Sequence, residues 1–71
     1  MEIYINTEYI KLNSLLKLAG LIDQGSDIKA FLHGGNIMVN GEPATQRGKK
    51  IWPGDKVVFK GAEILVCSEE A

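Results

Sequence analysis

The chain has 71 residues, 45% of them hydrophobic and 24% charged, and its formal net charge is −1. A chain of this length buries one small core worth roughly 3–5 kcal/mol and leaves no room for an enclosed active site, so we expect neither catalysis nor a small-molecule substrate. One cysteine and one histidine exclude an internal disulfide and a tetrahedral metal site, and no apolar run approaches the roughly 20 residues of a membrane-spanning helix. We therefore expect residues 1–71 to form a single monomeric domain in the cytoplasm, without cofactor, metal or membrane contact.

Charge is distributed unevenly along the chain. Residues 43–60 hold five cations and one carboxylate, whereas residues 1–42 have a net charge of −2 and residues 61–71 add three carboxylates. This polarisation allows a basic face that binds an anion on a protein that stays soluble.

Residues 2–6 alternate in hydrophobicity and predict a short strand, and residues 7–11 follow as a connector with some extended character. A helix is predicted next, because four apolar side chains have helical spacing: Leu12, Leu15, Leu16 and Ala19. Asn13 is its expected N-cap, and Gly20 is expected to adopt the left-handed conformation that ends it.

A second helix is predicted from Ser26, its expected N-cap, to the glycine pair Gly34-Gly35. Asp27 suits the positive end of its dipole, and the inward face carries Ile28, Phe31 and Leu32. Two short helices joined by a glycine-containing turn predict an αα-hairpin.

The rest of the chain is organised around residues 34–55, GGNIMVNGEPATQRGKKIWPGD. The alternation around Ile37 and Val39 predicts a strand, and Asn40-Gly41 favours a type I′ hairpin turn, which needs positive φ at both residues. A basic loop follows, and Pro53-Gly54 favours a type II turn.

Two further strands are predicted at residues 56–59 and 62–67, joined by a short turn at Lys60-Gly61. The order of elements predicts an α+β fold, with the αα-hairpin packed on a small antiparallel sheet of about four to five strands.

Signatures of common enzymes are absent: the chain has no nucleophile elbow, no phosphate-binding glycine loop and no His-Glu-x-x-His motif. Asp23 and Asp27 are interpreted as turn and helix-start residues rather than paired carboxylates. His33 is interpreted as a solvated or C-capping side chain, and Cys67 as a small buried hydrophobe.

The basic loop has two interpretations, a solvated turn or an anion-binding segment. Arg47 can make bidentate phosphate contacts, and the amides of Asn40 and Gln46 can contact sugar, phosphate or base edges. Trp52 is interpreted as a core anchor, with a base-stacking surface as the alternative.

Taken together, several segments resemble the S-four RNA-binding domain, the αL RNA-binding motif named for a small-subunit ribosomal protein. The segments are Lys11-Leu12-Asn13, Leu16-Lys17, Gly25-Ser26 through Lys29, Gly34 through Gly41, and Gly54-Asp55-Lys56-Val57. The resemblance spans about residues 7–59, and the chain is most similar to the short stand-alone bacterial members.

The resemblance implies a non-catalytic protein that binds structured RNA, expected to be ribosomal RNA, in ribosome assembly, translation or rescue. The implied RNA-contacting residues are Lys11, Lys17, Gln24, Ser26, Lys29, Asn40, Gln46, Arg47, Lys49 and Lys50. Ser26 and Gln24 fall at the start of the second helix, where free N–H groups can hold a phosphate. Family members often carry Arg where this chain has Asp27 and Gln46, and this loss of positive charge favours weak binding or binding shared with protein.

The alternative function is a protein-interaction adaptor or a β-grasp carrier without nucleic-acid binding. Small carriers also have a Pro-Gly-Asp-like turn before a valine strand. Their chemistry needs a C-terminal Gly-Gly, and the ending Ser68-Glu69-Glu70-Ala71 argues against a carrier.

Overall fold

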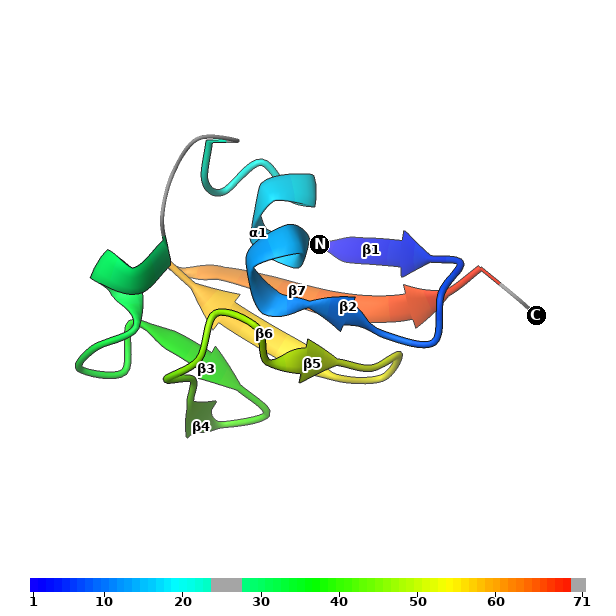
Figure 1. Ribbon diagram of the computed structural model, residues 1–71. Coiled ribbons are helices and arrows are strands. Elements are labelled where there is room, and N and C mark those ends of the chain that lie inside the picture. The colour runs from blue at the N-terminus through cyan, green and yellow to red at the C-terminus, as the bar shows by residue number, and fades with distance from the viewer. Residues whose placement is uncertain (24–27, 70–71) are drawn as a thin grey trace.

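A five-stranded sheet forms one layer of the molecule, and a helix with a small second sheet covers it (Figure 1). The computed structural model describes residues 1–23 and 28–69. In this part of the chain the large sheet has the strand order β1-β7-β6-β3-β4, and β2 pairs with β5 in the small one. The strands are β1 (Glu2–Ile5), β2 (Ile10–Lys11), β3 (Ile37–Val39), β4 (Glu42–Pro43), β5 (Lys50–Ile51), β6 (Lys56–Phe59) and β7 (Ala62–Ser68).

The α+β class is confirmed, but the expectation of a wholly antiparallel sheet is wrong for one pair. β1 runs parallel to β7, with Glu2 opposite Leu65 and Ile5 opposite Ser68, while β3–β4, β3–β6 and β6–β7 are antiparallel. Alternation in a sequence identifies a strand but not the direction of its partner. Parallel strands need a long crossover connection, and the residues between β1 and β7, which include the covering elements β2, α1 and β5, provide it.

The first predicted helix is present as α1 (Leu12–Leu18), but its cap differs from the prediction. Lys11 is the N-cap and makes no side-chain capping bond, whereas Asn13 lies inside the first turn. The backbone carbonyls of Lys49 and Arg47 take over the capping role by accepting hydrogen bonds from the N–H groups of Leu12 and Asn13, at 2.9 and 3.1 Å. At the other end Gly20 has φ +75°, which confirms its predicted conformation.

The predicted αα-hairpin is wrong, because the described residues contain α1 but no second α-helix. A four-residue 3-10 helix, η1 (Ile28–Phe31), lies where the second helix was expected. Apolar residues at positions i, i+3 and i+4 span barely one turn, so η1 is enough to bury Ile28 and Leu32. The expected cap Ser26 and Asp27 lie outside the described residues.

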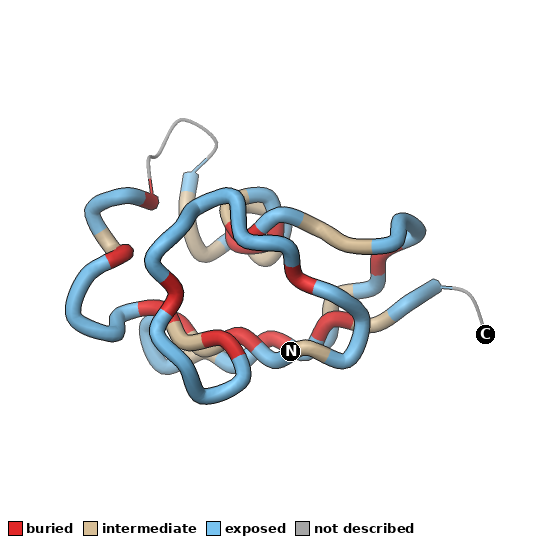
Figure 2. Tube along the Cα trace, turned by 60° about the horizontal axis from the view of Figure 1, so that its bottom comes forward, coloured by how far each residue is buried: buried red, intermediate tan, exposed pale blue. Residues whose placement is uncertain are grey.

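Buried apolar side chains from both layers form the core (Figure 2). Of the residues predicted from helical and strand periodicity, nine are buried: Leu12, Leu15, Leu16, Ile28, Leu32, Ile37, Val39, Val57 and Phe59. Ala19 and Phe31 are partly buried, and the ring of Phe31 meets that of Phe59 edge-on at 5.2 Å. Ile51 of β5 is fully buried, so the small sheet is anchored to the same core.

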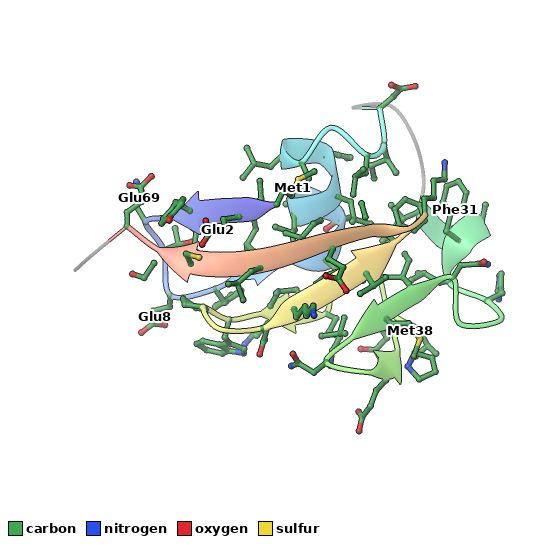
Figure 3. All side chains as sticks on the ribbon, turned by 180° about the vertical axis from the view of Figure 1, so that it is seen from behind. Met1, Glu2, Glu8, Phe31, Met38 and Glu69 are labelled. Carbon is green, nitrogen blue, oxygen red and sulfur yellow. The ribbon has the colours of Figure 1, made fainter. Side chains whose placement is uncertain are left out.

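The other face of the large sheet is not covered by any described helix or strand (Figure 3). Tyr4 and Leu65 are exposed on it at 54% and 39%. It also carries Glu63, which forms an ion pair with Lys56 at 3.4 Å. Lys11, Lys17 and Lys50, by contrast, lie on the elements that cover the opposite face.

Candidate nucleic-acid interface

The basic loop is docked on the start of α1. Besides the two capping bonds from Lys49 and Arg47, the loop is closed by the N–H of Lys49, which donates to the carbonyl of Gln46 at 3.3 Å. The loop adds its charges to that of Lys11, which immediately precedes α1.

Four cations therefore surround the start of α1, and we call them the cation cluster: Lys11, Arg47, Lys49 and Lys50. Lys11 and Lys50 are directly opposite each other in the antiparallel β2–β5 pair, and both are exposed. Like charges at facing positions repel each other and lower stability. In the described part of the chain, no carboxylate forms an ion pair with Lys11, Lys49 or Lys50.

Two tight turns flank the basic loop and are both as predicted. Asn40 and Gly41 have φ values of +52° and +84°, the type I′ pattern. Gly54 has φ +96°, and the N–H of Asp55 donates to the carbonyl of Trp52 at 2.9 Å, the type II pattern.

Asn40 was predicted as an RNA contact, but its side-chain amide is already engaged inside the protein. Its Nδ2 donates to Asp55 Oδ1 at 3.0 Å, and its Oδ1 accepts from the N–H of Lys56 at 3.0 Å. The residue therefore holds the turn in place.

The remaining predicted contacts are spread more widely. Lys17 lies in the last turn of α1, partly buried, and Lys29 is exposed on η1. Gln46 is exposed at the start of the basic loop. Gln24 and Ser26 lie outside the described residues. Lys17 and Lys29 therefore lie on elements other than those that carry the cation cluster.

Sequence reasoning missed the aromatic pair beside the cluster and placed Trp52 wrongly. Trp52 is 45% exposed rather than a core anchor, and its ring lies 5.2 Å from that of Tyr9. Lys50 Nζ lies 4.8 Å from the centre of the Tyr9 ring. The triplets Tyr9-Ile10-Lys11 and Lys50-Ile51-Trp52 carry the signal that could have revealed the pair. In each, an isoleucine that faces inward separates two side chains that face outward.

Within residues 1–23 and 28–69, no helix is long and apolar enough to cross a bilayer. The same residues contain no group of three or more histidine, cysteine, aspartate or glutamate side chains that would hold a metal ion.

The fold and the docked basic loop define a small α+β domain with a cationic surface, and comparison with known proteins identifies its family. Residues 3–67 match the S4 domain, and the chain belongs to this family. It is 44% identical over 59 residues to the "Probable ribosome maturation protein RlbA" of Bacillus subtilis (strain 168), covering 83% of each chain. It is also similar to the solution structure of YbcJ from E. coli, described as revealing an αL motif involved in RNA-binding. That likeness has a TM-score of 0.70 and 28% identity, and covers 93% of this chain and 85% of that one.

Proposed function

We propose that this protein is a non-catalytic RNA-binding protein that contacts structured ribosomal RNA through the cation cluster. One observation carries the proposal: the carbonyls of Arg47 and Lys49 cap α1 and so bring the basic loop beside Lys11. The four cations are then placed before any ligand arrives, which reduces the entropy lost on binding.

The chemistry of the cluster favours a ligand with several negative charges. The repulsion between Lys11 and Lys50, which face each other across β2 and β5, is relieved when a phosphate lies between them. Successive phosphates of an RNA strand supply such charges at regular spacing, and phosphate contacts provide most of the affinity in protein–nucleic acid binding.

The relatives support a role in ribosome maturation. RlbA is named a probable ribosome maturation protein, and the YbcJ structure is described in terms of RNA-binding. We place this protein in the same process, as a cytoplasmic, monomeric domain of residues 1–71 that binds RNA of a maturing ribosomal particle and needs no cofactor or small-molecule substrate. A pure adaptor role is less well supported, because it leaves Lys11, Lys49 and Lys50, which form no ion pair among the described residues, without a ligand.

Sucrose-gradient sedimentation of cell lysate tests the proposal. The test variant replaces Arg47, Lys49 and Lys50 together by Ala, and the matched control is Lys56→Ala. Lys56 is also an exposed cation, but it is paired with Glu63 on the open face of the sheet. Any tag belongs after residue 71, because the amino group of Met1 donates to the carbonyl of Glu63 at 2.6 Å.

We expect the wild type and the Lys56→Ala variant to sediment with a ribosomal particle at low salt, and the triple variant to stay at the top of the gradient. Digestion of the RNA before centrifugation releases a protein that is held by RNA. Sedimentation of the folded triple variant with the particle would instead assign the contact to another surface and support the adaptor role.

A further inference from the structure

An aromatic pair, the exposed Trp52 and the half-buried Tyr9, lies at the end of the small β2–β5 sheet, next to its two facing lysines. Ile10 lies opposite Ile51, and Lys11 lies opposite Lys50. Continuing this register by one residue places Tyr9 opposite Trp52, in agreement with the 5.2 Å between their rings, whose planes are inclined at 49°. The core does not need these rings, because Ile51 provides the buried anchor of β5.

Alternation along the two strands puts the aromatic pair and the lysine pair on the same side. Lys50 and Trp52 are both exposed on either side of the buried Ile51. Two residues of extended chain separate side chains by about 7 Å, so cations and rings are immediate neighbours. Lys50 joins the two pairs directly, since its Nζ lies 4.8 Å from the centre of the Tyr9 ring.

The backbone that carries Trp52 is held firmly. The N–H of Trp52 donates to Asp55 Oδ2 at 2.8 Å, and its carbonyl accepts the N–H of Asp55 at 2.9 Å across the Pro53-Gly54 turn. An aromatic ring on a backbone fixed in this way loses little conformational freedom when another ring stacks on it. Tyr9 restricts the Trp52 ring further from one side.

We propose that Tyr9 and Trp52 form a stacking platform for an unpaired nucleobase of the bound RNA, with Lys11 and Lys50 holding the adjoining phosphates. This inference rests on the proposed function and narrows it to RNA that contains a bulged or looped-out nucleotide. A base inside a duplex has both faces covered by its neighbours, so only an unpaired base offers a free face to an aromatic side chain. A nucleotide combines a flat ring with an anion in one unit, and this surface places aromatic rings next to cations.

Two short RNA duplexes of the same sequence, one fully paired and one with an unpaired adenine inserted, test the inference. Trp52 is the only tryptophan of the chain, so the fluorescence of the protein reports on this ring alone. We expect the bulged duplex to quench the fluorescence more strongly at saturation. It should also bind about 5- to 150-fold more tightly, the effect of stacking one base on an aromatic side chain. Equal quenching and equal affinity for the two duplexes would overturn the inference.

Matched variants separate stacking from simple loss of apolar surface. Trp52→Leu and Tyr9→Leu should remove the preference for the bulged duplex, while Trp52→Phe, which keeps a flat ring, should retain most of it. Tyr4→Leu is the control, because Tyr4 is an aromatic residue with 54% exposure on the open face of the large sheet. Melting temperatures of all variants serve to check that each one is folded.

The outcomes distinguish this inference from the function on which it rests. Loss of wild-type binding to both duplexes would overturn the proposed function and the stacking platform together. Salt-dependent binding of both duplexes with equal affinity, unchanged in Trp52→Leu, would overturn the platform alone. The aromatic pair would then be assigned to a protein partner.

Discussion

The side-chain amide of Asn40 joins the carboxylate of Asp55 and so ties together the two turns that flank the basic loop. Asn40 Nδ2 donates to Asp55 Oδ1 at 3.0 Å, and the other carboxylate oxygen accepts the N–H of Trp52 at 2.8 Å. One carboxylate thus connects the type I′ turn, the type II turn and the residue that carries the exposed indole. The geometry on both sides of the cation cluster depends on this pair.

Breaking the Asn40–Asp55 pair should cost stability although both residues are at least partly exposed. Asn40→Gly keeps the positive φ of the turn and removes only the amide, and we expect a loss of about 1–2 kcal/mol in the free energy of unfolding. Urea denaturation of the wild type, Asn40→Gly, Asp55→Ala and the double variant gives a double-mutant cycle. The entropy that Gly adds to the unfolded chain is the same in both variants that carry it, so it cancels from the coupling energy. We expect a coupling of at least about 0.5 kcal/mol, and strictly additive losses would contradict the pairing.

Asn13→Ala should leave the protein as stable as the wild type or more stable. The Oδ1 atom of Asn13 is buried without a hydrogen-bond partner among the described residues, and Ala is the better helix former. If Asn13 were the N-cap, the same change would cost about 1 kcal/mol. Thermal unfolding therefore distinguishes capping by the carbonyls of the loop, where Tm stays or rises, from capping by the Asn13 side chain, where it falls.

Gly41→Val should destabilise the hairpin through the backbone alone. A Cβ at Gly41 would meet nothing within 4 Å, but the residue has φ +84°, where a side chain costs about 1–2 kcal/mol and a β-branched one more. Gly48→Val is the matched control, since a Cβ there also has open space and its φ is outside the left-handed region. Equal melting temperatures for the two variants would contradict the type I′ turn.

RNA binding should depend strongly on salt. If the four residues of the cation cluster each neutralise a phosphate, log affinity should fall against log salt with a slope of about −3 to −4. Replacing Arg47, Lys49 and Lys50 together by Ala should flatten the slope by about two to three units without unfolding the protein, because exposed cations contribute little to stability. Lys56→Ala should leave the slope unchanged, and an unchanged slope in the triple variant would remove the basic loop from the interface.

Much of the fold could be predicted from the sequence because local rules decide it. The apolar spacing from Leu12 to Leu16 identified α1, and the need for positive φ at Asn40-Gly41 and at Gly54 identified both turns. The direction of β1 could not be predicted, since its partner β7 is distant in the chain. The second helix was also predicted wrongly, because the spacing of Ile28, Phe31 and Leu32 fits one turn of either helix type.

The candidate site was predicted in part. Arg47, Lys49 and Lys50 were recognised as a group from their closeness in sequence, but their attachment to the start of α1 depends on hydrogen bonds across more than thirty residues. Periodicity cannot show such bonds. The outward direction of Trp52 follows from its alternation with the buried Ile51, but this pattern is too short to be recognised without the pairing of β5 with β2.

Pairing of β1 with β7 postpones completion of the large sheet during synthesis of the chain. β1 is made first, yet the residues that pair with it, Leu65 to Ser68, follow more than 60 positions later. Until they emerge, β1 has no neighbour in the sheet, and the entropy cost of bringing these distant segments together has to be met late. The apolar β1 residues Ile3 and Ile5 therefore lack their neighbouring strand until β7 has left the ribosome, and the order of translation opposes stepwise folding from the N-terminus.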